Sequence, residues 1–162
     1  MGMIGYYFRA NEEMLNKIKK GDTASVVFDK KYQDNILDID KTWHAIHFVL
    51  NGNAYKGKKG NICGKLVFGD KPVNKDDLGY GPATLLEKEV VVQLAEELEK
   101  WDEKTFQENF HIKDMIEEQV YPVMPEEDEQ EFFQYVWAYF AELKEFLKKA
   151  AKEGQYVINF IF

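Results

Sequence analysis

The sequence contains few residues that can form covalent cross-links or act as catalytic nucleophiles. Its single cysteine, Cys63, excludes an internal disulfide bond. Ser25 is the only serine, and it does not stand in a Gly-x-Ser-x-Gly motif, so a serine hydrolase has no support. Because Cys63 stands in the apolar stretch 62–68, a buried, inert thiol is favoured over a nucleophile.

Long hydrophobic runs are also missing. No apolar stretch approaches the roughly 20 residues that a membrane-spanning helix needs. The first residues lack both the basic start and the apolar run of a secretory signal. We therefore expect a cytoplasmic protein without a membrane partner.

Basic residues are scarce in the second half of the chain. Residues 1–81 carry 13 Lys and Arg against 10 Asp and Glu, whereas residues 82–162 carry 8 against 19, and the whole chain has a net charge of −8. Such an acidic chain is a poor ligand for phosphates, so we expect no nucleic-acid partner. The basic cluster at 55–65 lacks the Gly-Lys-Ser/Thr ending of a phosphate-binding loop, which favours a solvated Gly-rich loop over an anion site.

Hydrophobic residues are abundant, at 45% of the chain with 15% aromatics, which indicates a packed core. The length of 162 residues suits a single domain spanning 1–162. Periodicity and capping residues predict strands at 3–10, 61–70 and 155–162, and helices at 12–20, 41–51, 87–101, 102–110, 111–119 and 126–154. Residues 22–35 stay ambiguous between strand and helix, and 71–86 are expected to form a long loop.

Strands at both ends with helices between them predict an α+β fold. We expect a mostly antiparallel or mixed sheet that includes the N- and C-terminal strands and is packed by several helices. The last strand is apolar on nearly both faces, as in a strand buried inside a sheet.

Two histidines, His44 and His47, lie three apart in the predicted helix 41–51, where Asp40 is expected to cap the first turn. Both rings could face one metal ion, but a catalytic zinc needs a third ligand, and Ala45 stands where His-Glu-x-x-His has its glutamate. We predict no metal. The apolar surroundings favour buried histidines that are hydrogen-bonded to backbone or carboxylate.

A second possibility is a cleft between this helix and the loop 77–84. Asp40, Trp43, His44 and His47 would face Tyr80 and Gly81, and a histidine there could act as an acid, a base or a donor to a ligand. No cofactor is predicted for it.

Several segments together resemble the YfbM-like family, a bacterial group of unassigned function. They are "MGMIGYYFRA", "LDIDKTWHAIHFVLNG", "DLGYGPATLL", "KWDEKTFQENFHIKDMIEEQVYP" and "LKEFLKKAAKEGQYVINF". The resemblance implies a small cytoplasmic α+β domain and carries no activity. The family's motifs map onto Asp40, Lys41 and Trp43, onto His47 and Phe48, and onto Gly79–Pro82. Its first histidine is not fixed and many members carry Arg at the position of Thr84, which weakens a site built on His44.

The sequence therefore leaves the biochemical function open. It favours a non-enzymatic interaction domain that recognises a basic protein partner through an acidic surface. The alternative is a small-molecule-binding protein or enzyme that uses the cleft described above. Exposed aromatics such as Tyr135 and Tyr139 suggest dimerisation as a third possibility, and the oligomeric state is not determined by the sequence.

Overall fold

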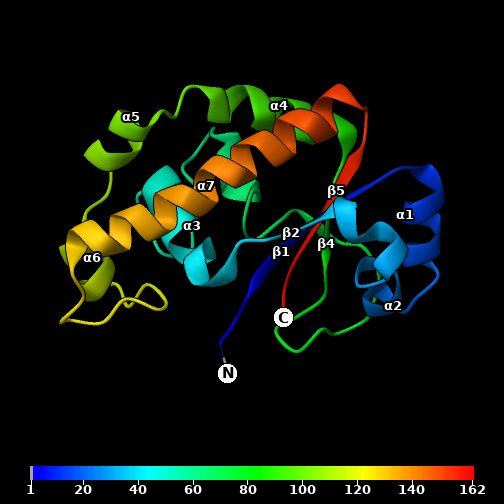
Figure 1. Ribbon diagram of the computed structural model, residues 1–162, viewed down its shortest axis with the longest axis horizontal. Helices are drawn as coiled ribbons and strands as arrows, with labels where there is room; N and C mark the ends of the chain where they lie inside the picture. The colour runs from blue at the N-terminus through cyan, green and yellow to red at the C-terminus, as the bar shows by residue number, and fades with distance from the viewer. Residues whose placement is uncertain (1) are drawn as a thin grey trace.

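The computed structural model describes residues 2–162 and is built around a five-stranded antiparallel sheet (Figure 1). The strand order is β2-β1-β5-β4-β3, with β1 at Gly5–Ala10, β2 at Ile36–Asp38, β3 at Lys71–Pro72, β4 at Thr84–Leu86 and β5 at Tyr156–Ile161. β1 and β5 pair along their full length, from Gly5 opposite Ile161 to Ala10 opposite Tyr156. The prediction of an α+β fold whose first and last strands share one sheet is confirmed.

Side chains alternate between the two faces of the sheet and feed two separate hydrophobic clusters. Tyr7 and Val157 belong to the larger cluster, whereas their neighbours Phe8 and Ile158 belong to the smaller one. The larger cluster is completed by the helices α3 (Trp43–Asn51), α4 (Lys88–Glu99), α5 (Glu103–Glu108), α6 (Ile112–Glu117) and α7 (Glu129–Lys152). The smaller one is completed by α1 (Glu12–Lys19), α2 (Thr23–Val27) and residues 73–83.

The long helices follow the predicted pattern closely. In α4, the predicted stripe of Val91, Leu94, Ala95 and Leu98 is buried. The helix α7 begins after Asp128, whose side chain accepts a hydrogen bond from the Glu131 N–H, and it carries acidic residues in its first turn and lysines in its last turn. It crosses the molecule from the end near α6 to the end near β5 (Figure 1).

The predicted strand 61–70 is wrong. Residues Ile62–Lys65 form a short 3-10 helix, η3, and turns follow it. The Asn61 side chain accepts a hydrogen bond from the Cys63 N–H at 2.8 Å, which starts the turn. The backbone then folds against itself, because a Cβ atom placed on Gly64 would lie 2.9 Å from the Cα of Gly57. Cys63 and Leu66 are still buried, so the apolar residues of this stretch serve the core without forming a strand.

Two further regions differ from expectation. The predicted loop 71–86 contains the strands β3 and β4. The ambiguous region 22–35 forms α2 and a second 3-10 helix, η1 (Lys30–Asn35), which leads into β2. A third 3-10 helix, η2 (Asp40–Thr42), precedes α3. The short strands carry too few residues for an alternating pattern to stand out in the sequence.

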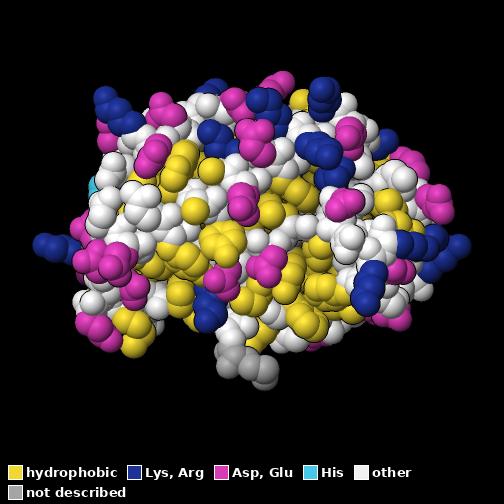
Figure 2. All heavy atoms as spheres, viewed as in Figure 1, with side chains coloured by type: hydrophobic (Ala, Val, Ile, Leu, Met, Phe, Trp, Pro, Cys, Tyr) yellow, Lys and Arg dark blue, Asp and Glu magenta, His cyan; other side chains and the backbone are white. Residues whose placement is uncertain are grey.

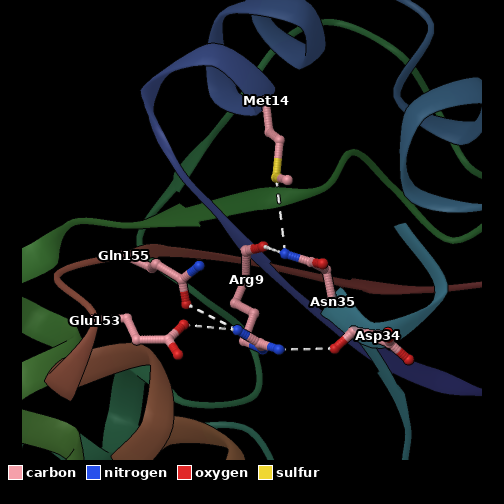
Figure 3. A network of polar contacts seen from close by, with 6 residues as sticks. All are labelled: Arg9, Met14, Asp34, Asn35, Glu153 and Gln155. Atoms are coloured by element: carbon pink, nitrogen blue, oxygen red, sulfur yellow. Dashed lines mark hydrogen bonds and ion pairs between the residues drawn. The ribbon is translucent and has the colours of Figure 1, made fainter. Parts of the chain in front are cut away.

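Arg9, the only arginine of the chain, connects β1 to the ends of two other elements (Figure 3). Its guanidinium donates to Glu153 Oε2 at 2.9 Å, to Gln155 Oε1 at 3.2 Å and to the backbone oxygen of Asp34 at 2.9 Å. The Asn35 side chain donates in turn to the backbone oxygen of Arg9. This network fixes the end of α7 and the end of η1 against the sheet.

Candidate functional site

The first histidine of α3 joins two distant backbone segments. His44 Nδ1 accepts a hydrogen bond from the Tyr121 N–H at 2.8 Å, and Nε2 lies 2.8 Å from the backbone oxygen of Ala54. These partners require the neutral tautomer that carries its proton on Nε2. The ring also stacks on Trp43, which stacks on Tyr121. Burial lowers the pKa of His44, so the ring stays neutral near pH 7.

The second histidine is used in the same way. His47 Nε2 lies 3.1 Å from the backbone oxygen of Lys56, and Nδ1 accepts from the Asn51 side chain at 3.3 Å. Burial lowers the pKa of His47 to about 4. Both nitrogens of each ring are therefore occupied by protein groups, and the prediction of buried, hydrogen-bonded histidines is confirmed. Across residues 2–162, no group of three or more His, Cys, Asp and Glu side chains is arranged to hold a metal ion.

Asp40 does not cap α3, contrary to the prediction. The helix begins after Thr42 without a side-chain cap, and Asp40 lies in η2 with a left-handed backbone φ of 52°. Its carboxylate accepts a hydrogen bond from the Tyr135 hydroxyl at 2.7 Å. The same hydroxyl accepts from the Lys41 N–H at 3.2 Å. The side chain of Asp40 is thus held at the surface, beside α7.

The structure does not bring Tyr80 and Gly81 to the histidines. They lie in the turn between β3 and β4, where the Asp77 carboxylate accepts from the Gly79 and Gly81 N–H groups. Leu78, in this turn, belongs to the smaller hydrophobic cluster, whereas Trp43 belongs to the larger one. The two halves of the predicted cleft therefore pack on opposite faces of the sheet, and Tyr80 itself is 55% exposed.

Cys63 also has a structural role. It is fully buried, and burial raises the pKa of its thiol to about 12, so the thiolate that would act as a nucleophile is disfavoured at neutral pH.

Two carboxylates and three tyrosines surround the end of β2, and we call this group the Tyr–Asp cluster: Tyr6, Asp38, Asp40, Tyr135 and Tyr139. Tyr6 lies opposite Asp38 on the face of the smaller hydrophobic cluster, whereas Asp40 is bonded to Tyr135 on the side of the larger one. The Asp38 side chain accepts from the Asp40 N–H at 2.7 Å, which orients both residues. The rings of Tyr135 and Tyr139 meet edge to face with centroids 5.5 Å apart. Burial together with the Asp38 and Asp40 carboxylates raises the pKa values of Tyr6 and Tyr139.

A group of aromatic rings adjoins this cluster, in which Phe28 and Phe162 are exposed, Tyr6 is half-buried and Phe160 is buried beneath them. Tyr6 stacks on Phe160, and Phe28 meets both rings and also Phe162. Phe28 is 41% exposed and Phe162 50% exposed. We call Tyr6, Phe28, Phe160 and Phe162 the aromatic patch. Figure 2 shows hydrophobic side chains gathered near the chain ends on this face, with acidic side chains among them.

The sequence signals for this surface were incomplete. Tyr135 and Tyr139 stand out as aromatics on the wide apolar face of the last helix, and Asp38 and Asp40 stand out beside the histidines. Tyr6 and Phe28 were missed. Tyr6 joins the cluster because it lies opposite Asp38 in the pairing of β1 with β2, and this register follows from a three-residue strand that the sequence did not predict.

An apolar pocket of about 510 Å³ lies outside the predicted site, in the segment after α6. It is lined by residues of the segment 116–125, including Val120, Pro122 and Met124. Its lining is mostly apolar, and the hydroxyl of its one ionisable side chain, Tyr121, accepts a hydrogen bond from the Met3 N–H at 3.0 Å.

Residues 1–160 match the family described as Domain of unknown function (DUF1877). The chain belongs to this family. It is 25% identical to Protein YfbM of Escherichia coli (strain K12) over 173 residues, which cover 99% of each chain. The crystal structure of a protein of unknown function, YfbM from Escherichia coli, superposes with a TM-score of 0.75 at 24% identity, covering 99% of this chain and 100% of that one.

These findings confirm the resemblance to the YfbM-like family and the α+β fold, and they assign no specific function. No helix within residues 2–162 is long and apolar enough to cross a membrane.

Proposed function

We propose that this chain is a cytoplasmic, non-enzymatic binding domain whose Tyr–Asp cluster holds basic side chains of a partner protein. One observation carries the proposal. Asp38 and Asp40 are oriented by hydrogen bonds, yet neither carboxylate forms a salt bridge with a lysine or arginine of residues 2–162. Two oriented carboxylates that have no cationic partner within the described residues are suited to bind a cationic side chain of another protein.

The tyrosine rings add to this chemistry. A guanidinium or ammonium group binds carboxylate oxygens through charge-assisted hydrogen bonds and is also attracted to the faces of aromatic rings. Tyr6, Tyr135 and Tyr139 are half-buried, so their rings are ordered by packing while part of each stays accessible. Because the cluster is already assembled, little ordering entropy is lost when a cation binds.

The charge of the whole molecule supports the same partner. A net charge of −8 attracts basic proteins and repels acidic ones. The aromatic patch beside the cluster offers apolar contact area, which a charged cluster alone lacks.

Cross-linking in bacterial cells tests the proposal. A photo-cross-linking amino acid replaces Tyr139 in the cluster, and a second variant carries it at Tyr80, which is equally aromatic and more exposed but lies in the β3–β4 turn. We expect position 139 alone to capture a partner, with the cross-linked segment rich in Lys or Arg. Capture of the same proteins at both positions, or of an acidic or uncharged segment at 139, contradicts the proposal.

A pair of isosteric substitutions separates charge from shape. Asp38→Asn and Asp40→Asn combined remove two negative charges, while an asparagine at 40 still accepts a hydrogen bond from Tyr135. We expect the double variant to lose most of the cross-linking at position 139 at unchanged thermal stability. Undiminished cross-linking would show that the carboxylates do not bind the partner.

A further inference from the structure

The edge strand β2 leaves backbone groups free for pairing. It is the outermost strand on its side of the sheet. Leu37 lies opposite Tyr7, and the Ile39 N–H donates to the Gly5 oxygen at 2.9 Å. In an antiparallel ladder, hydrogen-bonded pairs alternate with non-hydrogen-bonded pairs. The N–H and C=O groups of Ile36 and Asp38 therefore point away from β1, toward the outside of the sheet.

The opposite edge of the sheet is protected. There the Val73 N–H donates to the Ala83 oxygen, so the alternation turns Pro72 outward. Proline has no N–H, and its ring occupies the place where an added strand would pair. β2 contains Ile, Leu and Asp, without a proline or lysine to block its edge. The two edges thus differ in whether their outward-facing residues offer a backbone N–H to an added strand.

The open edge ends in the Tyr–Asp cluster, because Asp38 belongs to both. A residue paired with Asp38 projects on the same face of the sheet as Asp38 and its other neighbour, Tyr6. A Lys or Arg at that place meets the Asp38 carboxylate with its charged end and the aromatic patch with its aliphatic stem. Opposite charges on directly paired residues stabilise a sheet.

We propose that an extended basic segment of the partner protein adds to β2 as an antiparallel strand, pairing with Ile36 and Asp38 and placing a Lys or Arg at the Tyr–Asp cluster. The inference rests on the proposed function and specifies how the partner is held. The outward N–H and C=O groups of these two residues bind its main chain, and the cluster selects its side chains.

The register makes the inference testable with a defined probe, a peptide of alternating Lys and Val about seven residues long, which is within the usual range of strand lengths. When Lys lies opposite Asp38, the N–H groups of the Lys residues face β2 and those of the Val residues face solvent. Two N-methylated peptides, one methylated at every Lys and one at every Val, thus block opposite edges of the same strand. Binding is followed by titration of the ¹⁵N-labelled protein.

We expect N-methylation at Lys to weaken binding about tenfold or more, as the loss of several backbone hydrogen bonds requires, and N-methylation at Val to change it less than about twofold. The amide signals of Ile36 and Asp38 should shift on binding, whereas that of Val73 at the protected edge should not. On the protein, Ile36→Pro should weaken binding as strongly as N-methylation at Lys, and Ile36→Val should not. The peptides leave the protein unchanged, so the test stands even where the proline variant folds poorly.

The outcomes separate the two proposals. Equal binding of both N-methylated peptides overturns the strand addition. If both N-methylated peptides bind equally well to the wild type but more weakly to the Asp38→Asn, Asp40→Asn double variant, the proposed function stands without the strand addition. No binding of the unmodified peptide also overturns the strand addition, and the cross-linking at position 139 then decides the proposed function by itself.

Discussion

At the scale of single residues, chemical type was a poor guide to role. His44 and His47 are the residues of α3 with catalytic potential, but both ring nitrogens of each histidine form hydrogen bonds with structural groups of the protein. Asp40, expected to cap a helix, instead presents a carboxylate at the surface. The difference comes from tertiary partners, Tyr121 for His44 and Tyr135 for Asp40, which lie 77 and 95 positions away in the chain.

The buried histidines predict a specific dependence of stability on pH. The pKa of His47 is lowered to about 4 by burial, whereas in the unfolded chain it returns to about 6.5. Between these values the unfolded state binds more protons, so the free energy of unfolding falls as the pH falls from about 6.5 toward 4. By about pH 5 we expect His47 to account for a loss of about 2 kcal/mol relative to pH 7.5.

The measurement is urea unfolding at several pH values, compared between the wild type and His47→Gln. The variant is less stable at neutral pH but should lose less stability on acidification, because Gln cannot take up a proton. His111→Gln, which replaces an exposed histidine, serves as the control. Parallel pH curves for wild type and His47→Gln would show that His47 does not cause the effect.

At the scale of secondary-structure elements, the sequence predicted what is long and periodic. The stripe of α4 and the capped, charge-complementary α7 carry local signals over several turns, and the apolar β5 is recognisable by its composition. β2, β3 and β4 have three, two and three residues, and their existence depends on partners that lie elsewhere in the chain. The stretch 61–70 has the composition of a strand, but Asn61 and the contact of Gly57 with Gly64 turn it.

The candidate surface could be predicted only in part for the same reason. Asp38, Asp40, Tyr135 and Tyr139 are visible as polar or aromatic residues on predicted elements. Their meeting depends on the register of β2 against β1 and on the packing of α7 over η2. Neither is encoded in the periodicity of one segment.

The hydrogen bonds of Arg9 hold the end of α7 and the end of η1 against β1. A lysine at position 9 has one charged nitrogen and cannot reproduce the planar fork that reaches three acceptors on two segments. We expect Arg9→Lys to lower the free energy of unfolding by about 2 kcal/mol, since position 9 is buried and a single ammonium group there cannot replace all three charge-assisted hydrogen bonds. Chemical denaturation with tryptophan fluorescence measures the change.

Glu153→Gln is the matched control for Arg9→Lys. The Glu153 side chain is 46% exposed, so its ion pair with Arg9 is partly screened by solvent, and Gln still accepts a hydrogen bond. This variant should cost less than about 1 kcal/mol. Equal losses for both variants would mean that the ion pair alone, and not the three-way fork, holds the segments.

At the scale of the whole molecule, charge is distributed along the chain in a way that bears on association. The acidic residues Glu126, Glu127, Asp128 and Glu129 precede or open α7 and are exposed, whereas Tyr135, one to two turns further on, belongs to the cluster. Charges outside a contact surface act on the approach of a partner, and charges inside it act on the lifetime of the complex.

This distinction predicts different kinetic effects for three sets of substitutions. Replacing Glu126, Glu127 and Glu129 by Gln should slow association of the Lys–Val peptide about threefold at low salt, with little change in dissociation, because these charges only steer the peptide. Asp40→Asn should instead speed dissociation, because it removes a contact. Lys58→Gln with Lys59→Gln makes the molecule more acidic and should speed association.

Stopped-flow measurements at low and high ionic strength separate the association and dissociation rates of the peptide. The differences in association rate should vanish at high salt as the charges are screened. An association rate that is unchanged by both the glutamate and the lysine substitutions would show that the acidic surface does not guide the partner.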